Sequence, residues 1–96
     1  MIESEIESKM RKAVKDRGGL FLKFVSPSST GAPDRIMVKK PGRVIFVELK
    51  KDGEVPTPRQ LWMHEQLRKY GLDVRVVIGL REALDLVEEV FIDAEL

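Results

Sequence analysis

Asp34, Glu48 and Lys50 are the residues of this chain whose types and spacing could carry out chemistry. They lie at the ends of two runs rich in branched apolar residues, 34–39 and 43–50, which predict β-strands. The lysine, proline and glycine between the runs are typical of a turn, so the sequence predicts an antiparallel hairpin.

The hairpin, if centred on Pro41, brings the two acids together. Lys39 then faces Arg43, and Asp34 faces Glu48 directly. Opposed side chains in an antiparallel pair have Cβ atoms about 4.5–5.5 Å apart, and like charges at that distance repel. Two carboxylates held so close need a proton or a cation between them.

Lys50 adds an ammonium group to this pair of carboxylates. It lies two residues after Glu48 and therefore on the same face of the strand, whereas Lys51 points to the opposite face. Two carboxylates and an ammonium at one end of a hairpin suit phosphodiester hydrolysis with a divalent metal, because hard cations prefer carboxylate oxygens and water. The alternative is structural: a strand-end aspartate and a glutamate that pair with nearby lysines.

Composition limits the other classes of site. The 96 residues, 43% of them hydrophobic, predict one globular domain over residues 1–96. There is no cysteine and one histidine, which excludes disulfides and argues against a zinc site. No apolar run approaches the length of a membrane span and no signal peptide is visible, so the expected location is the cytoplasm of a bacterium or of a phage-infected host cell.

Charge is unevenly distributed along the chain. Residues 34–51 carry six basic and two acidic side chains, whereas residues 82–96 carry six acidic side chains and no basic one. A basic patch suits a polyanion such as DNA, although lysines that guard a sheet edge would explain it equally well. The candidate contacts to a nucleic-acid backbone are Lys23, Gly31, Arg35, Lys39, Lys40, Arg43, Lys51 and Arg59.

The elements that must position these residues follow from periodicity and turn signals. We expect helices at 3–17, 57–70 and 80–91, strands at 20–25, 34–39, 43–50 and 73–78, and loops at 26–33 and 51–56. Three consecutive strands predict an antiparallel meander, and the helix before the last strand favours a parallel pair. The second helix should turn Gln60, Met63, His64, Leu67 and Tyr70 inward, and the last should bury Leu80, Leu84, Val87 and Phe91.

Four segments in order resemble the VRR-NUC family of the PD-(D/E)XK nuclease superfamily. They are Ile6-Glu7, Gly31-Ala-Pro-Asp34, Phe46-Val-Glu-Leu-Lys50 and Pro58-Arg-Gln60. The likeness extends from the first helix to about residue 78. It implies an α/β fold with a restriction-endonuclease-like αβββαβ core, a mixed four-stranded sheet flanked by helices.

The resemblance also implies roles for individual residues. Glu7, Asp34, Glu48 and the Leu49 carbonyl would hold Mg²⁺ or Mn²⁺, with Lys50 acting on the attacking water. Helical spacing places Glu7 beside the apolar face of the first helix, and Glu3 on the same stripe is the reserve candidate.

Three residues of the second helix have more than one reading. By resemblance Gln60 contacts water or phosphate, but Thr57-x-x-Gln60 is also a capping box. His64 is a possible general base, although a histidine at the margin of the core is the more ordinary explanation. Trp62 falls on the exposed side and could stack on a base, be a simple surface aromatic or, as we favour, pack on a second subunit.

Together these features predict a metal-dependent DNA endonuclease, and the resemblance implies products that carry a 5′ phosphate and a 3′ hydroxyl. The chain offers no obvious recognition helix, which argues for selection of DNA structure rather than sequence. Because stand-alone relatives are thought to be dimeric and junction-directed, the resemblance implies a homodimer that resolves Holliday junctions. Cleavage of flaps and nonspecific nicking are the alternative activities. The alternatives from other classes are a nuclease-fold binding module without catalysis and an interaction subunit of a larger complex.

Overall fold

The computed structural model describes residues 1–27 and 30–92. In chain order its elements are α1 (Glu3–Asp16), β1 (Leu20–Lys23), β2 (Arg35–Lys39), β3 (Arg43–Lys50), α2 (Pro58–Lys69), β4 (Asp73–Ile78) and α3 (Gly79–Val90). The predicted bounds of β3 and β4 are confirmed, and those of the other elements differ by at most two residues. Parts of the predicted loop at 26–33 and of the acidic stretch at 82–96 lie outside the described residues.

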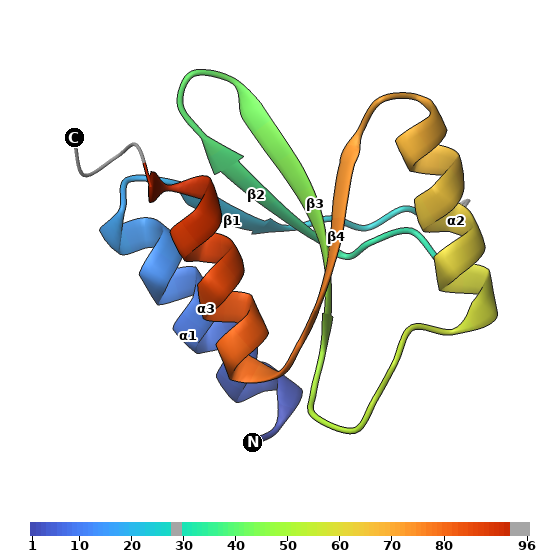
Figure 1. The fold of residues 1–96 in the computed structure, drawn as a ribbon, viewed down its shortest axis with the longest axis horizontal. Coiled ribbons are helices and arrows are strands. Elements are labelled where there is room, and N and C mark those ends of the chain that lie inside the picture. The colour runs from blue at the N-terminus through green and yellow to red at the C-terminus, as the bar shows by residue number, and fades with distance from the viewer. Residues whose placement is uncertain (28–29, 93–96) are drawn as a thin grey trace.

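The four strands form one mixed sheet in the order β1-β2-β3-β4 (Figure 1). β1, β2 and β3 are an antiparallel meander, and β4 runs parallel to β3. The predicted topology is therefore confirmed, and the αβββαβ core is that of a restriction-endonuclease-like α/β fold. None of the three helices in the described part of the chain has the length and apolar character of a transmembrane helix.

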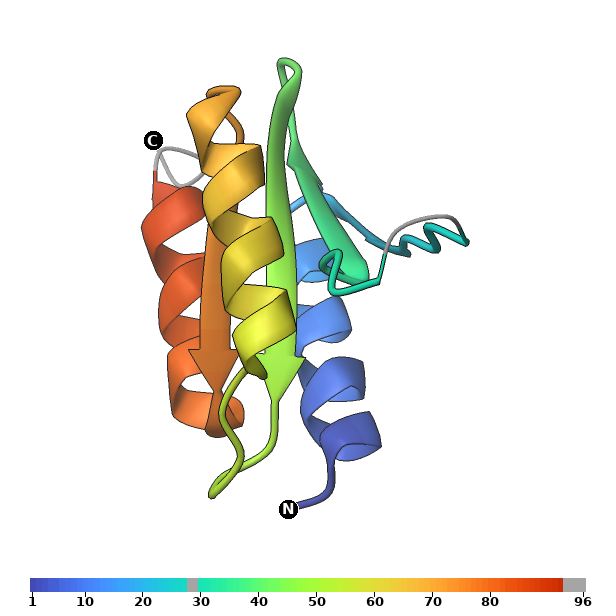
Figure 2. The same ribbon diagram turned by 90° about the vertical axis from the view of Figure 1, so that its right-hand side faces the viewer.

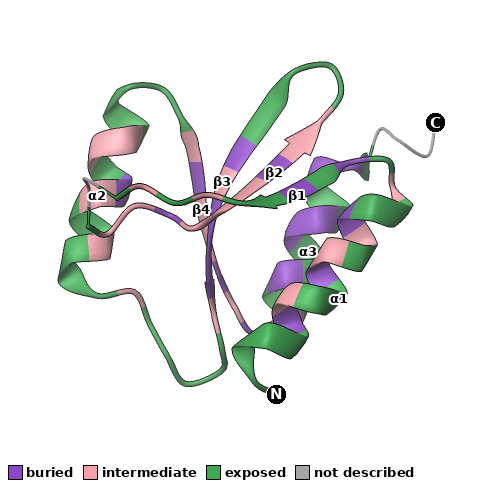
Figure 3. Cartoon of the chain, turned by 180° about the vertical axis from the view of Figure 1, so that it is seen from behind, coloured by how far each residue is buried: buried purple, intermediate pink, exposed green. Residues whose placement is uncertain are grey.

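The helices cover the two faces of the sheet unequally. α1 and α3 lie side by side on one face, and α2 lies against the other face near β4 (Figures 1 and 2). Most buried residues lie between the α1–α3 layer and the sheet, where Figure 3 shows them in purple. This main core contains Ile6, Met10, Val14, Phe21, Met37, Ile45, Val47, Leu49, Val77, Ala83, Leu86, Val87, Val90 and Phe91.

Two details of the predicted helix faces are wrong. Leu84 is 37% exposed, while Ala83, Leu86 and Val90 are buried. α3 packs against α1 as well as against the sheet, so its buried face is rotated toward α1. Tyr70 is also exposed, because it is the C-cap residue of α2, where the chain leaves the helix.

Each edge strand of the sheet is bonded by an arginine from a neighbouring helix. In α1, Arg11 Nη1 donates to the Phe21 carbonyl of β1 at 2.6 Å. In α2, Arg68 Nη2 and Nε donate to the Val74 carbonyl of β4 at 2.7 and 3.2 Å. Edge strands carry backbone groups that another strand could bond, and side chains that cover them limit such pairing.

Candidate active site

The predicted hairpin register is confirmed. Lys39 pairs with Arg43 across the turn. Carried one residue beyond β2, the same register sets Asp34 opposite Glu48. The two acids therefore meet where β2 begins and β3 nears its end.

Glu48 is a buried carboxylate in a crowded electrostatic environment. Its exposed fraction is 4%, and Oε1 has no hydrogen-bond partner among the described residues. The pKa of Glu48 is raised to about 7, chiefly by burial and then by the charges of Asp34 and Glu3. Lys50 and Arg35 act in the opposite direction. At neutral pH this carboxyl is thus close to its own midpoint of ionisation.

Lys50 lies beside Glu48, as the alternation of side chains along β3 predicts. Its Nζ is 3.9 Å from Glu48 Oε2, and its side chain is largely buried. Lys51 instead pairs with Glu54 at 3.8 Å, and both of these side chains are half exposed. The adjacent lysines are therefore in different environments, and Lys50 is the one in the site.

Asp34 also offers an oxygen without a donor. Its Oδ2 pairs with Arg35 Nη1 at 2.9 Å, whereas the buried Oδ1 has no hydrogen-bond partner within residues 1–27 and 30–92. Buried polar atoms are normally bonded, and an opposed pair of carboxylate oxygens without donors fits a divalent cation. No three His, Cys, Asp or Glu side chains of the described residues form a metal-binding group. A cation here would therefore need ligands besides carboxylates, such as a main-chain carbonyl, water and phosphate.

The two candidate acids of α1 differ in their contacts. Glu7 forms ion pairs with Arg11 and, at 3.7 Å, with Arg35 Nε. Glu3 is exposed, and its charge contributes to the raised pKa of Glu48. Glu7 stays a predicted metal ligand, although its carboxylate is already paired with two arginines. Glu3 is the acid of α1 whose charge acts on Glu48.

Gln60 forms the predicted capping box at the start of α2. Gln60 Oε1 accepts from the Thr57 backbone N–H at 2.9 Å, and Thr57 Oγ1 accepts from the Gln60 N–H at 3.1 Å. The structural half of the prediction is confirmed. The role of Gln60 toward water or phosphate stays a prediction, for which its side-chain amide N–H groups would be the donors.

The contact of His64 with Glu48 is the feature of the site that the sequence predicted least well. It is fully buried, and its Nε2 lies 3.4 Å from Glu48 Oε1. Burial is the first cause that lowers the pKa of His64, and the charges of Arg68 and Lys50 also lower it, so the site favours the neutral imidazole. Its position one turn after Gln60 on the inward face was the available signal, but the contact with Glu48 depends on how α2 packs on the sheet.

Arg59 and Gly31 join the first turn of α2 to the loop that carries Asp34. Arg59 Nε donates to Thr30 Oγ1 at 3.1 Å and to the Thr30 carbonyl at 3.3 Å. Gly31 has φ +85°, and a Cβ there would lie 2.9 Å from the Arg59 carbonyl oxygen. The Arg59 guanidinium also stacks on Trp62, 4.6 Å from the ring centroid, and Trp62 is 48% exposed, as predicted.

The remaining candidate contacts to nucleic acid lie in different settings. Lys23 and Lys40 are exposed, and Lys39 is half-buried. The Arg35 side chain is 11% exposed and paired with Asp34 and Glu7, which leaves little of it for a nucleic-acid backbone.

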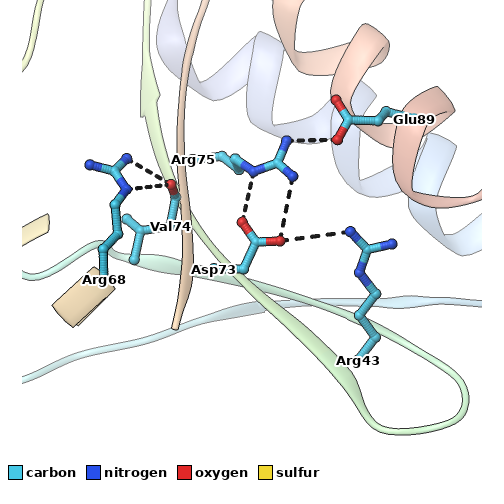
Figure 4. A network of polar contacts seen from close by, with 6 residues as sticks. All are labelled: Arg43, Arg68, Asp73, Val74, Arg75 and Glu89. Carbon is cyan, nitrogen blue, oxygen red and sulfur yellow. Dashed lines mark hydrogen bonds and ion pairs between the residues drawn. The ribbon is translucent and has the colours of Figure 1, made fainter. Parts of the chain in front are cut away.

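Arg43 lies at the far end of β3 from Glu48, in a chain of ion pairs (Figure 4). It contacts Asp73 at 3.7 Å; Asp73 in turn bonds Arg75 at 2.7 Å, and Arg75 bonds Glu89 of α3 at 2.8 Å. Arg43 therefore helps to fasten the starts of β3 and β4 to α3, and its side chain remains partly exposed.

Known proteins that resemble this chain include a nuclease and two solved structures with the same fold. No protein-family model matches the chain. The chain is 44% identical over 75 residues, 78% of its length, to "Putative nuclease p44" of Acyrthosiphon pisum secondary endosymbiont phage 1, and the match covers 81% of that protein.

Two solved structures have the same fold. One, described as a VRR_NUC domain, superposes with a TM-score of 0.82 at 34% identity over 90% of this chain and 94% of its own. A second, described as a VRR_NUC domain protein, gives a TM-score of 0.75 at 21% identity over 98% and 90% and supports the fold alone. The identity to the phage protein and to the first structure, each over most of both chains, shows that this chain belongs to the VRR-NUC family of nucleases.

Proposed function

We propose that this nuclease is a DNA endonuclease that requires Mg²⁺ or Mn²⁺ and acts at Asp34, Glu48 and Lys50. The observation that carries the proposal is the pair of buried oxygens, Asp34 Oδ1 and Glu48 Oε1, for which the described residues supply no hydrogen-bond donor. A lysine lies 3.9 Å from the second carboxylate. Carboxylates on opposed positions of two paired strands, each with an oxygen that lacks a donor, are suited to a hard cation.

The ligands of such a cation would be Asp34, Glu48 and the Leu49 carbonyl, with Glu7 or Glu3 of α1 contributing directly or through water. When bound, the ion supplies polarisation of the scissile phosphate and a lowered pKa for the attacking water. Lys50 would donate to that water or to a phosphate oxygen and so steady the charge that develops there. Gln60, fixed by its cap, would donate from its amide nitrogen. The products would carry a 5′ phosphate and a 3′ hydroxyl.

The preferred substrate in this proposal is branched DNA, with a four-way junction first. The backbone contacts would come from exposed lysines such as Lys23 and Lys40, which position DNA but do not read its sequence. A homodimer would present two active sites related by a two-fold axis to a two-fold substrate. Family membership supports nuclease activity, and the choice of junction and the dimer are the finer parts of this proposal.

The test is cleavage of a labelled four-way junction, a flap and a plain duplex with Mg²⁺, with Mn²⁺ and with chelator. Asp34→Ala and Lys50→Ala should lose at least two orders of magnitude in rate, because each removes a group that contacts the reacting atoms. Lys51→Ala is the matched control, since Lys51 neighbours Lys50 but pairs with Glu54. Its rate should stay close to that of the wild type.

Each outcome has a distinct meaning. Metal-dependent paired cuts on the junction establish both the enzyme and its preferred substrate. Equal cutting of all three substrates keeps the enzyme and rejects the junction preference. Retained DNA binding with no cutting in either metal points to an inactive binding module, and loss of DNA binding at moderate salt as well points to an interaction subunit.

A further inference from the structure

His64 and Glu48 form a buried contact that the proposed chemistry does not use. His64 comes from the middle of α2 and Glu48 from β3, on the sheet face that α2 covers. Their facing atoms, Nε2 and Oε1, are 3.4 Å apart. At this distance the two atoms form no hydrogen bond, and both His64 nitrogens and Oε1 are without a hydrogen-bond partner in the described ranges. A buried polar group left in this way costs stability, so an apolar residue would serve packing better than a histidine.

The surroundings of Glu48 show what His64 could do. Lys50 Nζ lies 3.9 Å from Oε2, so the two oxygens of the carboxylate face two different side chains. His64 is fully buried and cannot reach bulk water, which removes the role of general base toward a water in an open site. The nitrogen that faces Oε1 can instead donate a hydrogen bond to it.

The helix that carries His64 is fixed at both ends. The capping box of Thr57 and Gln60 closes its first turn, and Arg68, one turn after His64, bonds the Val74 carbonyl of β4 at 2.7 Å. A side chain on such a helix has little freedom to move relative to the sheet. His64 can therefore impose an orientation on Glu48 that the strand alone would not.

We propose that His64 is a positioning residue for Glu48. Its Nε2–H, 3.4 Å from Oε1, would close this approach to a hydrogen bond and so set the plane of the carboxylate, which leaves the other lone pair of Oε1 for the cation. This inference rests on the proposed role of Glu48 as a metal ligand. Groups that bond a ligating carboxylate typically change metal affinity by 10–100-fold when they are lost.

The test is Mn²⁺ affinity measured by electron paramagnetic resonance on the intact protein. His64→Leu keeps a similar volume without a donor, and we expect a 10–100-fold weaker affinity. His64→Gln returns an N–H near the position of Nε2, and its affinity should stay within about threefold of the wild type. Gln66→Leu, on the same helix, is the matched control and should bind as the wild type does.

Thermal melting in chelator separates positioning from folding. His64→Leu and His64→Gln should each keep a single cooperative melting transition, so that a change in Mn²⁺ affinity is not a loss of the fold. Wild-type affinity in His64→Leu would overturn the proposal. Equal losses in His64→Leu and His64→Gln would overturn it too, since the ring rather than its donor would then matter.

Failure of the proposed function would look different. If Glu48→Gln bound Mn²⁺ as tightly as the wild type, Glu48 would not be a ligand, whatever His64 does. In that case the ¹³C carboxyl resonance of Glu48 in metal-free protein decides on the contact itself. It should move in His64→Leu and stay in place in Gln66→Leu, and an unmoved resonance in His64→Leu would reject the contact.

Discussion

The burial of the Glu48 carboxylate lowers the stability of the folded protein once this group ionises. An ordinary glutamate ionises near pH 4.5, and in the folded protein burial and the nearby acids raise the pKa of Glu48 to about 7. Between these values the folded state holds a proton that the unfolded state has released. The contribution of Glu48 to the free energy of unfolding of the metal-free protein therefore falls as pH rises through this range.

Glu48→Gln should remove this contribution. For Glu48 alone the loss between pH 4.5 and pH 7 should reach about 3 kcal/mol, since each unit of pKa shift corresponds to about 1.4 kcal/mol. The lowered pKa of His64 acts in the opposite direction below pH 6.5, so the net loss in the wild type is smaller than this. Urea unfolding in chelator at a series of pH values measures it. Glu65→Gln, an exposed glutamate of α2, is the control and should keep the wild-type slope. An unchanged slope in Glu48→Gln would show that another group titrates.

At the residue scale the sequence predicted what depends on local geometry. A turn centred on Pro41 and the alternation of side chains along a strand were enough to place Asp34, Glu48 and Lys50 together. The contact of His64 with Glu48 and the pairing of Glu7 with Arg35 join segments far apart in the chain. Such contacts depend on the angle at which a helix packs on the sheet, which residue spacing does not specify.

At the scale of elements, the close approach of Gly31 to α2 fixes the loop that leads into Asp34. We expect Gly31→Ala to destabilise the protein roughly twice as much as Gly71→Ala, which should cost about 1 kcal/mol for its left-handed backbone alone. Both glycines have φ +85°, but a Cβ at Gly71 would meet no described atom within 4 Å. Chemical denaturation of the two variants gives the comparison. If the two variants lost the same free energy of unfolding, the loop would be able to move away from α2 without a penalty.

The elements themselves were well predicted because their signals are local. Branched apolar runs bounded by turn residues define β3 and β4, and Thr57 with Pro58 marks the start of α2. The buried face of α3 was less well predicted. The exposure of Leu84 reflects packing against α1, a partner that periodicity within one helix cannot identify.

At the scale of the whole molecule, the net charge is only +1, but the charges are unevenly distributed along the chain. Lys23 and Lys40 are exposed. If both contact phosphates, the double variant Lys23→Ala/Lys40→Ala should bind DNA more weakly, and the slope of log K against log salt should fall by up to about 2. Fluorescence anisotropy over a salt series measures the slope. Lys9→Ala, an exposed lysine of α1, should leave it unchanged, and an equal loss in that control would indicate a diffuse effect of charge.

The two arginines that bond the edge strands limit how this molecule can associate. Arg11 occupies the Phe21 carbonyl on one side of the sheet, and Arg68 occupies that of Val74 on the other. A second copy that joined its sheet to this one at these carbonyls, or a strand added there during aggregation, would first have to displace an arginine. Pairing that leaves these bonds intact would use helices or the open face of the sheet, so two copies would meet as separate four-stranded sheets rather than as one continuous sheet of eight strands.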